Sequence, residues 1–243
     1  MSTSPEELVI LADRLERRAL TCHINREFTQ ANKNITGALS CYARAVSVGH
    51  TEALVPYANL LDATEQVEKA FDAYLEGANC ESAYCEASVG HMYQRGEGVE
   101  TDDQKAYYWI SRAVARKHSV EILSAYVMMA NFHYCSSAVE EDRVESYRWL
   151  LITLAVCKKN AKYSDCDYSV IDLRRSRYSL WPGFYYKKKD RPLCLSVSEV
   201  ARELRDFLRQ IASELSSEEI KIAHQRAISW ARLHRRDLID SLL

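Results

Sequence analysis

The chain has 243 residues, which is long enough to bury a substantial core in one or two domains. Its 7 glycines and 4 prolines are few for this length, which argues against a β-rich fold with many tight turns and favours an all-α protein. A formal net charge of −2 excludes a global bias toward nucleic acid.

The first residues carry acidic side chains where a secretory signal needs positive charge. The longest apolar run lies near residues 149–157 and is too short to span a bilayer. We therefore expect a soluble, cytoplasmic protein with no membrane partner.

The predicted elements begin with a helix over about residues 5–20. Ser4 can cap this helix, Pro5 suits its first turn, and Glu7 completes a capping box with Ser4. We interpret residues 1–36 as an N-terminal helical cap.

Residues 37–158 contain self-similar segments that predict helix–turn–helix repeats of about 36 to 41 residues. The segment AYCEASVGHMY (83–93) aligns with SAYVMMANFHY (124–134) at an offset of 41. The second helices align in the same way, as GALSCYARAVSVGHTEAL, KAYYWISRAVARKHS and ESYRWLLITLAVCKK. Because one helix pair cannot bury its apolar surface alone, the repeats must stack, with small residues where the helices approach.

The best repeat carries a recurring pattern: Ala83-x-Cys85, Val89-Gly90, Tyr93, Gly96-x-Gly98-Val99, Asp102-x-x-Lys105-Ala106, Trp109 and Ala113. This pattern resembles the Sel1-like repeat (SLR), a relative of the tetratricopeptide repeat. The match is close over 81–119, eroded over 121–158 and partial over 37–78. The resemblance implies a right-handed α-solenoid that binds other proteins and has no activity in the repeats.

Residues 196–243 contain two amphipathic segments, opened by the capping boxes Ser196-x-x-Glu199 and Ser216-x-x-Glu219. They resemble the closing hairpin of SLR proteins, and we interpret them as a C-terminal capping helix pair. Together the segments predict a single α-solenoid domain over residues 1–243.

Residues 159–195 interrupt the repeats with a basic, aromatic insertion, in which Pro182-Gly183 predicts the turn of a small β-hairpin. Residues 174–191 have a formal charge of +6, which leaves −8 for the rest of the chain. Such a segment suits contact with an acidic protein partner or with single-stranded nucleic acid, or its aromatic side chains pack on the solenoid edge. The candidate contact residues are Arg174, Arg175, Tyr178, Trp181, Tyr185, Lys187 and Lys188.

A second candidate surface is the groove that the first helices of stacked repeats are expected to line. Its predicted positions are those that the repeat pattern leaves free. They are Tyr84, Ser88, His91 and Arg95, continued at the offset of 41 by Ala125, Met129, Phe132 and Ser136. We expect the larger of these side chains to be exposed in the groove.

No residue pattern predicts catalysis, a metal site or a cofactor. The eight cysteines form no CxxC pair, show no zinc-finger spacing and do not recur at the repeat period, so we expect buried free thiols. The histidines have no visible partner base or orienting group.

The sequence therefore favours a non-enzymatic scaffold whose partner is another protein, and it predicts no particular oligomeric state. The most specific hypothesis is a bacterial immunity protein that binds and neutralises a toxic effector. The first alternative is a regulatory adaptor or chaperone-like partner in a secretion or signalling complex. The second alternative, which we disfavour, is a nucleic-acid-binding protein that uses the basic insertion.

Overall fold

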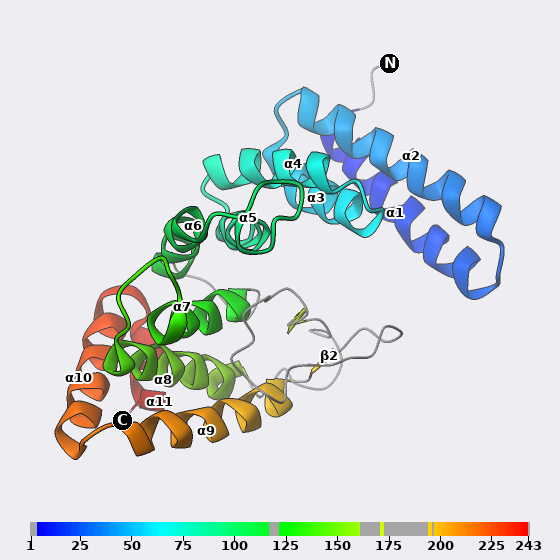
Figure 1. Ribbon diagram of the computed structural model, residues 1–243. Coiled ribbons are helices and arrows are strands. Elements are labelled where there is room, and N and C mark those ends of the chain that lie inside the picture. The colour runs from blue at the N-terminus through cyan, green and yellow to red at the C-terminus, as the bar shows by residue number, and fades with distance from the viewer. Residues whose placement is uncertain (1–3, 117–121, 161–170, 173–193, 196, 243) are drawn as a thin grey trace. The chain divides into compact units, whose positions relative to one another are not determined.

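The computed structural model describes residues 4–116, 122–160, 171–172, 194–195 and 197–242. Its backbone divides into two compact units (Figure 1). The first comprises Met1–Cys85 and Glu97–Val99, and the second comprises Glu86–Gly96 and Glu100–Leu243. The single domain expected from the sequence stays a prediction.

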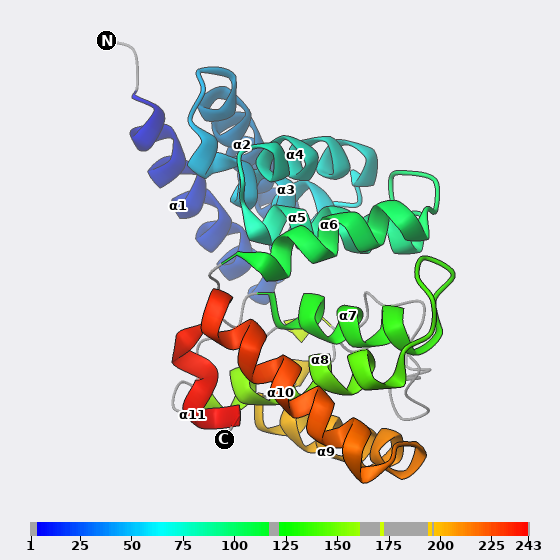
Figure 2. The same cartoon turned by 90° about the vertical axis from the view of Figure 1, so that its left-hand side faces the viewer.

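The first unit is built from two helix pairs. The long helices α1 (Pro5–Ile24) and α2 (Phe28–Ser47) pack along each other, and α3 (Leu54–Ala63) and α4 (Val67–Asn79) form the next pair after a short 3₁₀ turn, η1 (Thr51–Ala53) (Figure 2). Ala12 and Ala38 are fully buried in the core of the first pair. The Tyr42 hydroxyl donates a hydrogen bond to Asp13 Oδ1 at 2.5 Å, which satisfies the polar end of a buried ring.

The start of α1 agrees with the sequence, because Ser4 and Glu7 form the predicted capping box. The predicted boundary between residues 36 and 37 does not coincide with a helix end, since α2 runs continuously from Phe28 to Ser47. Gly37 faces α1, because a Cβ there would lie 3.1 Å from Leu15 Cδ1, and α2 already contacts α1 before this point through Asn34 and Cys22.

The second unit contains most of α5 (Ala83–Arg95), then α6 (Asp103–Ala115), α7 (Leu123–Cys135) and α8 (Arg143–Asn160). It closes with α9 (Val197–Glu214), α10 (Ser217–His234), the 3₁₀ turn η5 (Arg236–Leu238) and α11 (Ile239–Leu242). Helix α8 is central and packs against α7, α9, α10 and α11. Its Trp149 ring lies 5.4 Å from the ring of Trp230 in α10. The all-α fold and the C-terminal helix pair are therefore confirmed, including the capping box of Ser216 and Glu219.

Two short strands lie within the basic insertion. β1 (Ile171–Asp172) pairs antiparallel with β2 (Cys194–Leu195), and they lie against α7 and α9 respectively. The pairing places residues 171–172 beside residues 194–195. The predicted turn at Pro182-Gly183 and the residues around it lie outside the described part of the chain.

Four helices end in the same turn, in which one residue takes a left-handed conformation. In each turn the next residue donates its N–H to a carbonyl five residues earlier, for example Gln66 to Leu61 at 2.9 Å. This is the hydrogen-bond pattern of a Schellman motif, in which glycine is the usual left-handed residue. In these four turns glycine takes the left-handed position only once, and the residues at that position are Arg26 (φ 63°), Gly49 (87°), Glu65 (61°) and Glu81 (65°).

Two helical glycines offer a matched test of helix approach. A Cβ on Gly90 of α5 would lie 2.6 Å from Ile110 Cγ1 and 3.1 Å from the Ala106 carbonyl oxygen of α6. A Cβ on Gly37 of α2 would meet only Leu15 Cδ1, the end of a flexible side chain, at 3.1 Å. Both substitutions to alanine gain about 1 kcal/mol in helix propensity.

We therefore expect Gly37→Ala to be neutral or stabilising. Gly90→Ala should lose up to about 2 kcal/mol net, because overpacking costs about 1–3 kcal/mol and the gain in helix propensity offsets about 1 kcal/mol of it. Urea unfolding of both variants measures the difference. Equal effects would show that α5 and α6 do not approach closely at Gly90.

Candidate functional site

The predicted groove positions on α5 are not exposed in the structure. Ser88, His91 and Arg95 are all less than one-tenth exposed. His91 Nε2 lies 3.0 Å from Ser124 Oγ, so this face of α5 meets the start of α7. The first helices of successive repeats stack side by side. The repeat spacing alone does not tell which face of such a helix packs against the next one and which face is exposed to solvent.

The matching positions on α7 are buried as well. Met129 and Phe132 are 2% and 1% exposed, and Ala125 is fully buried. The expected exposure of these side chains is wrong, because α7 is apolar on nearly every side and packs against α6 and α8. A helix with apolar residues all around is a buried helix.

Tyr84 belongs to the first unit and is half-buried. Its hydroxyl donates to Asn59 Oδ1 at 3.1 Å, and the same oxygen accepts a hydrogen bond from the Tyr74 hydroxyl at 2.6 Å. The candidate contacts of the insertion lie outside the described residues. They are Arg174, Arg175, Tyr178, Trp181, Tyr185, Lys187 and Lys188.

The second unit has a pocket at the C-terminal ends of α5 and α7, with a volume of about 230 Å³. We call it the polar pocket, and its lining residues are Gln94, Asp103, Asn131, Phe132, Cys135, Ser136 and Ser137. Of the predicted groove residues, Phe132 and Ser136 line this pocket. Gln94, Asp103 and Asn131 were not predicted. The available signal was Asn131, a polar residue at the repeat position that Gly90 fills in the preceding repeat.

Two loops meet at the polar pocket. Asp102 caps α6 by accepting the Lys105 N–H at 2.9 Å, and this places Asp103 in the first turn. The Ser137 hydroxyl donates to Asp103 Oδ2 at 2.6 Å, which ties the loop after α7 to the start of α6. Burial raises the pKa of the Cys135 thiol, and the negative charges of Glu141 and Asp103 raise it further.

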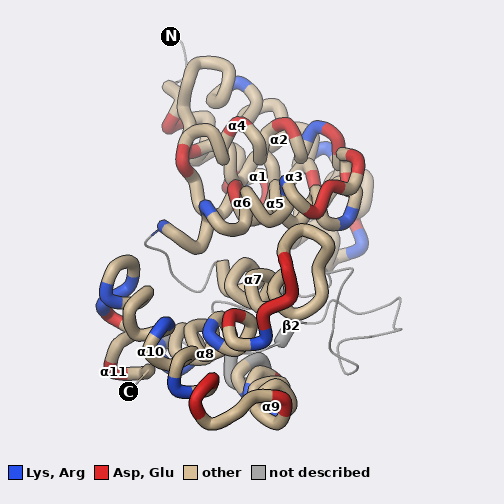
Figure 3. Tube along the Cα trace, turned by 60° about the vertical axis from the view of Figure 1, so that its left-hand side comes forward, with Lys and Arg blue, Asp and Glu red and all other residues tan. Residues whose placement is uncertain are grey.

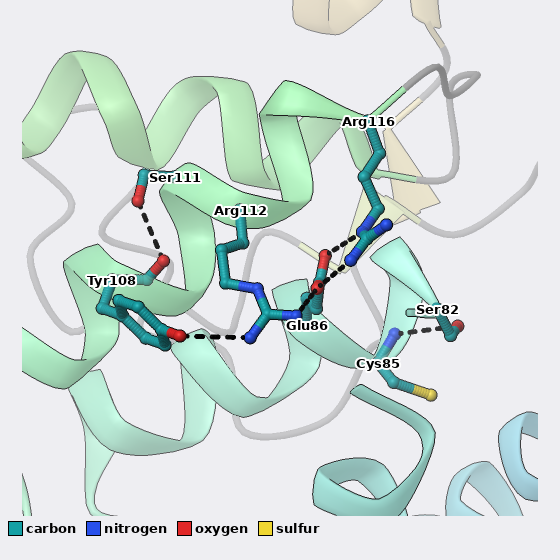
Figure 4. Close-up of polar contacts among 7 residues, drawn as sticks. All are labelled: Ser82, Cys85, Glu86, Tyr108, Ser111, Arg112 and Arg116. Atoms are coloured by element: carbon teal, nitrogen blue, oxygen red, sulfur yellow. Dashed lines mark hydrogen bonds and ion pairs between the residues drawn. The ribbon is translucent and has the colours of Figure 1, made fainter. Parts of the chain in front are cut away.

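Helix α5 also carries a buried ion-pair cluster, formed by Glu86, Arg112 and Arg116 (Figure 4). The Glu86 side chain is fully buried. Its Oε1 lies 2.9 Å from an Arg112 Nη atom, and its Oε2 accepts a hydrogen bond from Arg116 Nε at 2.8 Å. The carboxylate is thereby neutralised by two cations from the end of α6, which is a structural role.

The described residues contain no group of three or more histidine, cysteine or acidic side chains placed to hold a metal ion. No helix in the described part of the chain is long and apolar enough to cross a membrane.

One solved structure settles the fold. A protective antigen of uropathogenic Escherichia coli strains, which displays an SLR fold, superposes on 98% of this chain with a TM-score of 0.64 at 15% sequence identity. This chain has the Sel1-like repeat fold. It spans 40% of the length of that antigen.

A second structure with the SLR name is more distant. A Sel1 repeat protein from Oxalobacter formigenes matches 57% of this chain and 69% of its own, with a TM-score of 0.44 and 16% identity. The sequence matches no protein-family model and no curated protein. At 15% identity, the similarity to the antigen concerns the fold alone, and function has to be argued from the site.

The cysteines give a test of burial in the SLR fold. Six of the cysteines form no disulfide: Cys22, Cys41, Cys80, Cys85, Cys135 and Cys157. Cys80 is exposed, whereas burial raises the pKa of the Cys157 thiol to about 12. At pH 8 only about one Cys157 in ten thousand is a thiolate, the form that reacts with alkylating reagents.

We therefore expect iodoacetamide to label Cys80 within minutes and Cys157 only as the protein unfolds, with peptide mass spectrometry as the readout. Urea should bring both to the same rate. Rapid labelling of Cys157 in the native protein would contradict its burial between α8 and its neighbours.

Proposed function

We propose that this protein is a non-enzymatic scaffold that binds another protein through its helical repeats. The observation that carries the proposal is the polar pocket. A buried polar group costs free energy unless it is hydrogen-bonded, so helices that stack for structure alone would fill these positions with apolar side chains. The pocket retains Gln94, Asn131 and Asp103 instead.

The size of the polar pocket supports a protein partner over a small molecule. Small-molecule sites usually have volumes of about 300–1,000 Å³, and this pocket has about 230 Å³. A pocket of this size suits one side chain of a larger partner that covers the surrounding helices. Stacked helical repeats offer extended surfaces of that kind.

Affinity capture with the full chain from its native cells, followed by mass spectrometry, tests the proposal. We expect one protein to be enriched repeatedly, and to bind the purified chain directly. Capture of single-stranded nucleic acid, with binding that falls steeply as salt rises, would instead favour the basic insertion as the functional element.

The more specific proposal is a bacterial immunity protein that neutralises a toxic effector. It rests on the resemblance of the repeats to SLR proteins, which include such inhibitors. The free thiols support a reducing compartment such as the cytoplasm. Co-expression with the product of the adjacent gene tests it, because an immunity protein restores growth of the producing cell. A neighbouring secretion or signalling component whose activity changes on binding would favour an adaptor.

A further inference from the structure

The polar pocket contains an acceptor that lacks a donor. Gln94 is 3% exposed, and its Oε1 atom has no hydrogen-bond partner among the described residues. A buried acceptor that is left unsatisfied lowers stability, because it has lost its hydrogen bonds to water. A ligand that brings an N–H group to Gln94 would remove this cost.

The charge at the pocket is negative. Asp103 accepts a hydrogen bond from Ser137, and no basic side chain in the described residues lies within ion-pair distance of its carboxylate. The hydrogen bond holds the two loops at the pocket side by side, and both are acidic (Figure 3). Besides Asp103, the acidic residues of these loops that belong to the second unit are Glu100, Asp102, Glu140, Glu141 and Asp142.

Nearby basic side chains offset only part of this charge. Lys105 pairs with Asp102 at 3.1 Å, and Arg143 pairs with Glu141 at 3.4 Å. Arg226 lies 3.8 Å from Asp142. Glu100 and Glu140 have no such partner among the described residues, so the rim of the pocket attracts a cation.

The lining atoms favour a guanidinium group over an ammonium group. Gln94, Asn131 and Asp103 supply oxygen acceptors from three different helices, and Phe132 supplies an aromatic ring. A guanidinium is planar, presents five N–H donors and stacks on aromatic rings, so it can satisfy several acceptors together. An ammonium is a more strongly hydrated point charge, which makes it costlier to bury.

We propose that the polar pocket receives an arginine side chain of the protein partner. The proposal rests on the protein-binding function argued above and names the group that is recognised. The arginine would donate to the unsatisfied oxygen of Gln94 and to the carboxylate of Asp103.

The probe is acetyl-Gly-Arg-Gly-amide, titrated into the full ¹⁵N-labelled chain. We expect weak, millimolar binding, with amide shifts concentrated at residues 94, 103 and 131–137. The peptide with citrulline in place of arginine has the same shape without the charge and should shift nothing at that concentration. The lysine peptide should bind more weakly than the arginine peptide.

Two variants and one control locate the binding. Gln94→Met removes the acceptor at similar size, and Asp103→Asn removes the charge while keeping an oxygen for Ser137. Each should weaken binding about tenfold or more, because a hydrogen bond to a charged group contributes about 1.5–3 kcal/mol. Asp72→Asn makes the same charge change on the exposed face of α4 and should leave binding unchanged.

Equal binding of the arginine and citrulline peptides to the unmodified chain would overturn the proposal, whatever the variants do. So would capture of the protein partner at full strength by both pocket variants, and in that case the scaffold function would stand. If the arginine peptide binds the pocket but no protein is captured, the proposed function fails and the pocket's specificity for guanidinium remains.

Discussion

Gly98→Ala is expected to lower the free energy of unfolding by about 2–5 kcal/mol. Gly98 has φ of 67°, and a Cβ there would lie 2.5 Å from the carbonyl oxygen and 2.8 Å from the carbonyl carbon of Val67. The left-handed conformation costs an L-residue about 1–2 kcal/mol. The clash adds about 1–3 kcal/mol, because it is with backbone and cannot be relieved by a rotamer change.

Gly49→Ala is the matched control for this substitution. Gly49 also has a positive φ, 87°, but a Cβ there would meet nothing within 4 Å. It should therefore lose only the conformational term of about 1–2 kcal/mol. Urea unfolding of the two variants separates conformation from contact. Equal losses would mean that the loop residues 97–99 do not pack on the start of α4.

The second large effect is expected when the cations around Glu86 are removed. The double substitution Arg112→Met and Arg116→Met leaves the fully buried Glu86 carboxylate beside two apolar methionine side chains. Breaking a buried ion pair from one side costs about 3–5 kcal/mol, because the remaining charge is uncompensated. We expect a loss of stability of this size, measured by urea unfolding at pH 7.

Removing the carboxylate instead should cost less. In Glu86→Met the two arginines remain, and their side chains are already 32% and 25% exposed, so water can solvate their charge. The triple variant, with methionine at all three positions, should recover much of the stability that the double arginine variant loses. A larger loss for Glu86→Met than for the double arginine variant would contradict the assignment of Glu86 as the buried partner.

Much of the helical order could be predicted because it depends on short-range signals. The capping residues Ser4 and Ser216 lie beside the turns that they start, so their effect is visible within four residues of sequence. The repeat offset also predicted the equivalence of α5 and α7. The true start of α2 at Phe28 could not be predicted, because its N-cap residue Glu27 makes no side-chain capping hydrogen bond.

The site was harder to predict, because exposure depends on long-range packing. Repeat spacing identifies Met129 and Phe132 as equivalent to Ser88 and His91 but does not say which helix covers them. Their burial follows from the neighbours α6 and α8. The polar pocket depends on the contact of Asp103 with Ser137, which are 34 residues apart in sequence. No local pattern encodes such a contact.

The repeated turn at the helix ends leaves room for engineering. Arg26, Glu65 and Glu81 each hold a left-handed conformation that glycine adopts without strain. Replacing the three with glycine should gain about 1 kcal/mol at each, once the greater freedom of glycine in the unfolded chain is deducted. All three lie in the first unit and the polar pocket lies in the second. The triple glycine variant therefore stabilises the first unit alone, and comparing the unfolding of the two units in this variant measures how strongly their unfolding is coupled. If unfolding of the second unit moves with the first, the whole chain melts as one thermodynamic body.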